Sequence, residues 1–241
     1  MELAGYFIIF VTFVVVFTFE VIAPASGNDC DKRWQIYAGA ISGFQIVVAL
    51  AAGYLFSDWF AANAVFHLDP GIPVVVAAFL VFLAASLIAY WWHRATHRYD
   101  LLWRVFHQLH HSPARIEALT AFYVHPFDGF AANVLNVGVA FWLFGAGVDV
   151  AAAALLIAAL YNIYIHSDTR SPEWVGYFVQ RPEMHRVHHQ AGHHAQNYGL
   201  PIWDLMFGTF VNPKKNQFAC GFDKSKELRI RDMLLLKDVD G

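Results

Sequence analysis

Three short histidine clusters have the spacing of metal ligands. Residues 91–111 carry His93, His97, His107, His110 and His111, and His185, His188 and His189 repeat the H-x-x-H-H spacing. Residues four apart on a helix share one face, so the first and third histidines of H-x-x-H-H can bind one ion. The middle histidine is offset by about 100° and can reach a second ion. Two such helices facing each other predict a two-metal site, which the H-x-x-x-H pair would close on one side.

The number of histidines favours two ions over one. A single H-x-x-x-H pair arises often by chance, and one H-x-x-H-H could simply lie at a membrane surface. Three clusters, two of them with identical spacing, are hard to attribute to packing. Imidazole suits zinc, copper, iron and nickel alike, so the residue type does not select the metal. A structural zinc needs only four ligands, whereas the clusters offer eight.

The spacing also requires a turn between the first two clusters. On one straight helix His97 and His107 would be ~15 Å apart in height, too far for neighbouring metals. Asp100 precedes an apolar segment and is a candidate N-cap, which predicts a turn at residues 98–100. Pro182 and Gly192 are predicted to begin and end the helix of the third cluster.

The composition predicts a membrane protein. Of 241 residues, 58% are hydrophobic and 15% are charged, against about 45–50% and about 25% in soluble domains. Residues 3–23, 34–56 and 73–92 are long enough to cross a bilayer, and residues 127–144 and 148–165 form a hairpin that crosses or only dips in. We predict an all-α polytopic bundle of three to five spans, with a cytoplasmic helical cap around a histidine-rich dimetal site. Cys30 and Cys220 are far apart and suggest no disulfide framework.

The predicted organisation is one membrane-embedded domain over residues 1–241. Residues 3–92 supply three spans, 93–126 the cytoplasmic histidine helices, 127–166 the hairpin and 167–241 the cap with the third cluster. Every lysine and arginine falls in the loops on one side of this arrangement. Because cytoplasmic loops collect such residues, the site and the C terminus are expected inside, at the cell inner membrane or the endoplasmic reticulum. No nucleic-acid partner is expected.

The motifs resemble the sterol desaturase and fatty acid hydroxylase superfamily of integral-membrane di-iron oxygenases. The resemblance covers roughly residues 84–211. It rests on H-R-A-T-H, F-H-Q-L-H-H-S, Y-V-H-P-F, Y-I-H-S, R-P-E-M-H-R-V-H-H, Q-N-Y-G and W-D-L-M-F-G-T-F. It implies two irons that activate O2 to hydroxylate or desaturate a C–H bond of a sterol-like, hopanoid-like or acyl lipid. Zinc could replace iron in isolated protein. Electrons would come from a separate donor, such as a b-type cytochrome, a ferredoxin or a reductase.

The resemblance also assigns site residues. The implied ligands are His93, His97, His107, His110, His111, His125, His166, His185, His188 and His189, with Asn197 and Asp204 orienting them from behind. Asn162 stands where the fatty acid 2-hydroxylase branch is expected to have a histidine, and H-P-F-D-G lacks a glutamate often found after H-P. His193 and His194 are additional. Arg94, Arg98, Arg104 and Arg186 could form a docking face for the donor or bind lipid headgroups.

Two other classes remain open on the sequence. A histidine-rich membrane metal transporter or metal-binding protein would use the same residue type. Its sites usually lie at mid-bilayer, whereas these clusters follow predicted helix ends. A bis-histidine haem protein would show a Soret band.

Overall fold

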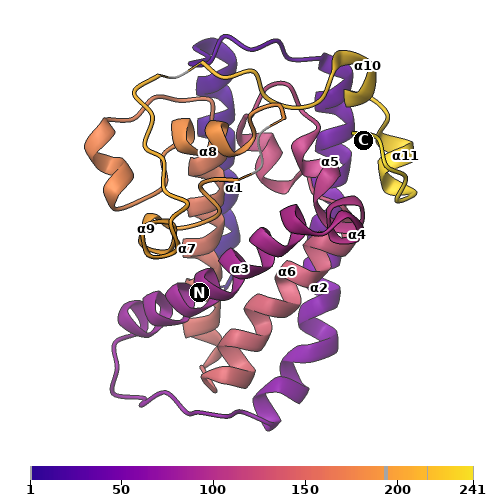
Figure 1. Cartoon of the computed structure of the whole chain (residues 1–241). Helices are drawn as coiled ribbons and strands as arrows, with labels where there is room; N and C mark the ends of the chain where they lie inside the picture. The colour runs from indigo at the N-terminus through magenta and orange to yellow at the C-terminus, as the bar shows by residue number, and fades with distance from the viewer. Residues whose placement is uncertain (1, 193–194, 216, 241) are drawn as a thin grey trace.

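The computed structural model describes residues 2–192, 195–215 and 217–240, and this part of the chain contains helices and loops with no strand beyond one isolated bridge between Gln190 and Cys220 (Figure 1). The N-terminal elements are α1 (Glu2–Ile22), α2 (Lys32–Ala62), α3 (Val74–Arg98), α4 (Asp100–Leu102), the π-helical η1 (Trp103–His107), α5 (Gln108–His111) and the 3-10 helix η2 (Ala118–Phe122). They are followed by α6 (Pro126–Val137), the π-helical η3 (Gly138–Leu143), α7 (Val148–His166), the 3-10 helix η4 (Glu173–Tyr177), α8 (Pro182–His188), α9 (Pro201–Phe207), α10 (Lys224–Glu227) and α11 (Ile230–Leu234).

Within the described residues, four helices are long and apolar enough to cross a membrane: α1, α2, α3 and α7. In Figure 1, α1, α2 and α7 run roughly alongside one another and α3 crosses them obliquely. Their outward side chains are apolar and exposed, as at Phe7, Ile36 and Val75, which fits a lipid environment. α6 has 12 residues and continues through η3 to Leu143, so these two elements form the first arm of the predicted hairpin.

Small residues allow α3, η3 and α7 to pack closely. Their shared core includes Ala78, Ala85, Ala140, Ala151 and Ala154. Small side chains at helix interfaces are the usual way for membrane helices to approach one another. This packing positions α3, whose C-terminal part carries His93 and His97 to the other histidines of the candidate site.

A second core supports the H-x-x-H-H helix α5 from the side away from its histidines. Leu109, between the histidines of α5, packs with Trp34 of α2, with Tyr123 and with Met233 of α11, and all four are buried. The C-terminal segment therefore forms part of the wall that positions α5.

The predicted turn between the first two clusters is confirmed. α3 continues out of the apolar segment to Arg98, Tyr99 is extended (φ −117°, ψ 119°) and α4 begins at Asp100. Tyr99 is the N-cap and Asp100 is the first helical residue, so the expectation that Asp100 is the N-cap is wrong. The acid lies in the first turn, where the positive end of the helix dipole stabilises a negative charge.

The prediction for the third cluster is half correct. Pro182 opens α8, but the helix ends at His188, and His189 is its C-cap. Gly192 does not end it, because Ala191 N already donates to Ala219 O (2.8 Å) beside the Gln190–Cys220 bridge. Pairing with the C-terminal segment therefore draws the chain out of the helix early.

Candidate metal centre

Nine histidines of the described chain converge in two groups. The first histidine group is His93, His97, His107, His111 and His188, and the second histidine group is His110, His166, His185 and His189. In each group one ligand nitrogen per residue lies within 4.8 Å of all the others. These nine are among the ten histidines predicted as ligands.

The division follows the helical spacing. α5 and the adjoining η1 give His107 and His111 to the first group and the intervening His110 to the second. α8 does the reverse, because His188 joins the first group while its neighbours His185 and His189 join the second. The two H-x-x-H-H segments face each other as the spacing predicts, so that each contributes to both groups. α3 completes the first group, and His166 at the end of α7 completes the second.

The Nε2 separations are those of atoms that share an ion. In the first group, His93 and His107 are 2.9 Å apart and His111 is 3.1 Å from His188. In the second, His166 is 2.8 Å from His185. Two imidazoles bound to one metal at about 2.0–2.1 Å, at ordinary angles, bring their nitrogens to about 2.9–3.4 Å.

The opposite ring nitrogens show that these contacts are not all hydrogen bonds. His166 Nδ1 lies 2.8 Å from Asn162 O, and His110 Nδ1 lies 3.3 Å from Tyr123 O. A carbonyl only accepts, so in both neutral rings the single proton is on Nδ1 and Nε2 carries a lone pair. Yet the two Nε2 atoms are 3.2 Å apart. Two lone pairs facing each other need a cation between them, and the donor set therefore fits a metal.

Burial keeps the imidazoles in the form that binds metal. Desolvation, reinforced by neighbouring imidazoles, lowers the pKa well below 6.5 for His107, His110, His111, His185 and His189. These rings are neutral at physiological pH, as a metal-ligating histidine must be.

Residues 196–198 hold two ligands of the first group by their backbone. His188 Nδ1 lies 2.8 Å from Gln196 O, and His93 Nδ1 lies 2.7 Å from Tyr198 O. Both contacts are donations to carbonyls, the usual way to fix the tautomer and orientation of a ligating histidine.

The predicted outer residues act on this same backbone segment. The side chain of Asn197 bonds to Met184 O and Val211 O through Nδ2 and accepts from Val211 N. Asp204 accepts from the N–H groups of Tyr198 (2.9 Å) and Gly199 (3.3 Å). Both side chains are fully buried. They hold the backbone that carries the Gln196 and Tyr198 carbonyls, and so they act on His188 and His93 through the positions of these carbonyls.

Some predicted residues lie elsewhere. His125 is outside both groups: its Nδ1 accepts from Phe127 N (3.1 Å), and its Nε2 faces Leu234 O (3.4 Å). His193 and His194 fall outside the described residues. Arg186 is fully buried, so the expectation that it belongs to an exposed docking face is wrong.

The sequence analysis missed Asp128 of α6. Its Oδ2 lies 3.8 Å from Nδ1 of His107, and both side chains are largely buried. Its position three residues after His125, in H-P-F-D-G, was the available signal.

The chain resembles several known proteins over part of its length. The chain is 29% identical to sphingolipid C4-hydroxylase sur2 of Schizosaccharomyces pombe over 148 residues, 58% of this chain and 50% of the relative. It is 31% identical to alkylglycerol monooxygenase of Xenopus tropicalis (59% of this chain, 32% of the relative). It is 30% identical to ornithine lipid hydroxylase OlsE of Rhizobium tropici (59% and 44%). The chain therefore spans half or less of the length of these relatives. No solved structure matches.

A sequence model of the fatty acid hydroxylase family matches residues 78–209. That region begins in α3 and ends just after α9, and it contains all nine histidines of the two groups. The match covers more than half of the chain, and with the histidine centre it shows that the protein belongs to the fatty acid hydroxylase family.

Proposed function

We propose that the protein is a membrane oxygenase that hydroxylates or desaturates a C–H bond of a lipid, using O2 and electrons from a separate donor. The observation that carries the proposal is the pair of buried histidine groups whose nitrogens approach one another at ion-sharing distances. Relatives named as a sphingolipid hydroxylase, an alkylglycerol monooxygenase and an ornithine lipid hydroxylase support a lipid as substrate. A sterol-like, hopanoid-like or acyl lipid would fit.

The chain's own residues would hold two iron ions, one in each histidine group, with zinc as a possible substitute in isolated protein. Bound iron would supply O2 activation and the oxidation of an unactivated C–H bond. The surrounding protein keeps the imidazoles neutral, fixes their direction through backbone carbonyls and excludes water from the centre. α3 and α7 carry ligands at the ends of candidate spans, which supports entry of an apolar substrate from the bilayer.

The proposal includes an orientation and a partner. The lysine and arginine distribution supports placing the histidine centre and the C terminus in the cytoplasm. Arg94, Arg98 and Arg104 follow the membrane part of α3 and are not buried. They are available to an anionic headgroup or to an electron donor, for which a b-type cytochrome, a ferredoxin or a reductase would serve.

The test compares lipid extracts of cells with and without the protein by mass spectrometry. We expect a lipid that gains the mass of one oxygen atom or loses that of two hydrogen atoms. His107→Ala should abolish this product while the protein still inserts in the membrane. His67→Ala is the matched control, because His67 is exposed in the loop between α2 and α3, and it should keep the product. Full activity of His107→Ala refutes the proposal, and metal flux in proteoliposomes without an oxygen-dependent product would favour a transporter.

A further inference from the structure

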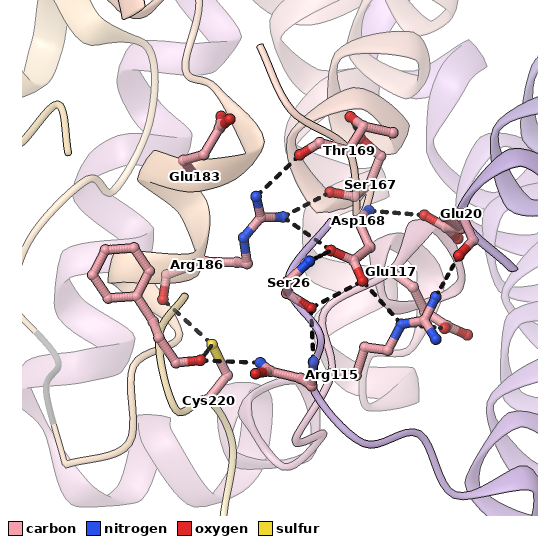
Figure 2. Close-up of polar contacts among 12 residues, drawn as sticks. Glu20, Ser26, Arg115, Glu117, Ser167, Asp168, Thr169, Glu183, Arg186 and Cys220 are labelled. Carbon is pink, nitrogen blue, oxygen red and sulfur yellow. Dashed lines mark hydrogen bonds and ion pairs between the residues drawn. The ribbon is translucent and has the colours of Figure 1, made fainter. Parts of the chain in front are cut away.

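Figure 2 shows a buried cluster of polar contacts, and two of its residues, Asp168 and Arg186, lie within two positions of His166 and His185 in the chain. We define the Asp168 cluster as Glu20, Ser26, Arg115, Asp168 and Arg186, whose exposed fractions run from 0% to 9%. The five residues come from the end of α1, the α1–α2 connection, the segment after α5, the segment after α7 and α8. Polar contacts thus join segments that are distant in sequence. Three of these segments, the ones after α5 and α7 and α8 itself, adjoin or carry ligand histidines.

Arg186 binds the segment that follows α7. Its Nη1 donates to Ser167 O (3.1 Å) and its Nη2 to Thr169 O (3.0 Å), and Nη1 lies 3.6 Å from Asp168 Oδ1 (Figure 2). The planar guanidinium presents its donors in a fixed fork, so these contacts set direction as well as distance. Arg186 therefore fixes the start of this loop against α8.

Asp168 connects that fork to the rest of the cluster. Its carboxylate accepts from the N–H (2.8 Å) and the hydroxyl (2.9 Å) of Ser26, and Arg115 Nε lies 3.1 Å from Oδ2. Its own backbone N–H donates to Glu20 Oε2 (2.8 Å). The carboxylate thus has a partner on every side, and it cannot shift without breaking contacts to α1 and to the segment after α5.

The location of the fork matters for the histidines. Arg186 directly follows His185 in α8, and Ser167 directly follows His166 at the end of α7. His166 and His185 belong to the second histidine group, with their Nε2 atoms 2.8 Å apart. The fork joins the end of α7 to α8, one residue away from each ligand.

Stability alone does not explain the cluster. Burying ionic groups costs desolvation energy, and apolar residues of similar size often stabilise a protein as well or better. A rigid fork between two ligand-bearing helices instead offers control of the geometry, which a metal site needs to within about 0.5 Å.

We infer that Arg186, held by Asp168, is a positioning residue that sets the distance between His166 and His185 and so the metal affinity of the second histidine group. This inference rests on the proposed function, because it requires that the second group binds a metal. The first histidine group draws four of its five ligands from α3, η1 and α5, takes only His188 from α8, and has no ligand on α7. It depends less on the α7–α8 distance.

The experiment is an anaerobic Fe²⁺ titration of full-length apoprotein in detergent. His97→Ala removes one of the five ligands of the first group and His185→Ala one of the four of the second, which gives two backgrounds with one intact group each. In the His97→Ala background, Arg186→Lys should weaken Fe²⁺ binding by ~10–100-fold, the usual effect of losing an outer partner of a ligand. In the His185→Ala background, Arg186→Lys should change the affinity by less than about threefold. Asp168→Asn should show the same selectivity, and it replaces Arg186→Lys if that variant does not fold.

Arg181→Lys is the matched control. Arg181 is also buried, lies directly before α8 and donates to two carbonyls, Ser171 O (3.1 Å) and Pro213 O (2.7 Å), neither of which adjoins a ligand histidine. It should leave Fe²⁺ binding unchanged in both backgrounds.

The outcomes separate the two levels of the proposal. Wild-type protein that binds no Fe²⁺ overturns the proposed function together with this inference. Wild-type protein that binds two ions, with Arg186→Lys unchanged or equally weakened in both backgrounds, overturns the inference alone. An equal loss of Fe²⁺ affinity in Arg181→Lys also overturns the inference, because any disturbance near α8 would then weaken metal binding.

Discussion

Replacing Asn197 by alanine should lower both the stability of the chain and the metal affinity of the first histidine group. The Asn197 side chain makes three buried hydrogen bonds, two to carbonyls and one from Val211 N, each worth about 1 kcal/mol. Asn197 also has a left-handed backbone (φ 55°), which costs alanine roughly 1–2 kcal/mol. The total loss is about 4–5 kcal/mol, or roughly 8–20 °C in Tm for a chain of this size.

Asn197→Gly separates the contribution of the side-chain hydrogen bonds from that of the left-handed backbone. Glycine adopts a positive φ without strain but cannot make the side-chain bonds, so this variant should be about 1 kcal/mol more stable than Asn197→Ala. Circular dichroism during heating in detergent measures both. The Gln196 and Tyr198 carbonyls that bind His188 and His93 flank this residue. Fe²⁺ affinity of the first group should therefore fall ~10–100-fold. A Tm of Asn197→Ala within about 2 °C of wild type, or a glycine variant less stable than the alanine variant, would refute this account.

Three further predictions concern substitutions at Asp204, Asp128 and Gly129. Burial raises the pKa of Asp204 from 3.8 to about 6, so the folded state holds this proton more tightly than the unfolded state. The free energy of unfolding should therefore fall by up to about 3 kcal/mol as the pH rises from about 4 to 6. Asp204→Asn should remove that share of the pH dependence of Tm. Asp128→Asn replaces the carboxyl group beside His107 Nδ1 by an amide and should weaken Fe²⁺ binding by the first group, as measured by titration, by ~10-fold or more. Asp149→Asn, at the far end of α7, should not. A Cβ at Gly129 would overlap Oε1 of Gln45, whose Nε2 donates to Val124 O, so Gly129→Ala should lower the unfolding free energy by about 1–2 kcal/mol in heat denaturation.

The helical positions of the histidines were predictable because they depend on local geometry. The helix rise and the reach of a side chain require the turn at Tyr99. The 3.6 residues per turn explain why His110 belongs to a different group from His107 and His111, and His188 to a different group from His185 and His189. The three N-terminal apolar helices were equally clear, since their length and composition suffice.

The outer contacts of the centre were not predictable, because they depend on backbone atoms and on the tertiary packing. Nothing in the types of Gln196 and Tyr198 shows that their carbonyls accept from ligand histidines. Arg186 looks like a surface residue because arginine is seldom fully buried, and only the carboxylate of Asp168 and two carbonyls from a distant segment explain its position. His125 shares the residue type of the ligands but is turned toward Phe127 and Leu234.

The two histidine groups are anchored by different means, and this difference gives the centre two separable sets of supports. The first group is fixed from outside by residues 196–198, which in turn depend on Asn197 and Asp204. The second group takes His166 from the end of α7 and His185 from α8, and Arg186 joins these two elements. Since α5 and α8 each contribute to both groups, a rotation of either whole helix would disturb both, whereas a shift of α7 against α8 changes mainly the second group, which alone has a ligand on α7. Because each of these two short helices contributes to both groups, the surrounding contacts must above all fix the orientation of α5 relative to α8.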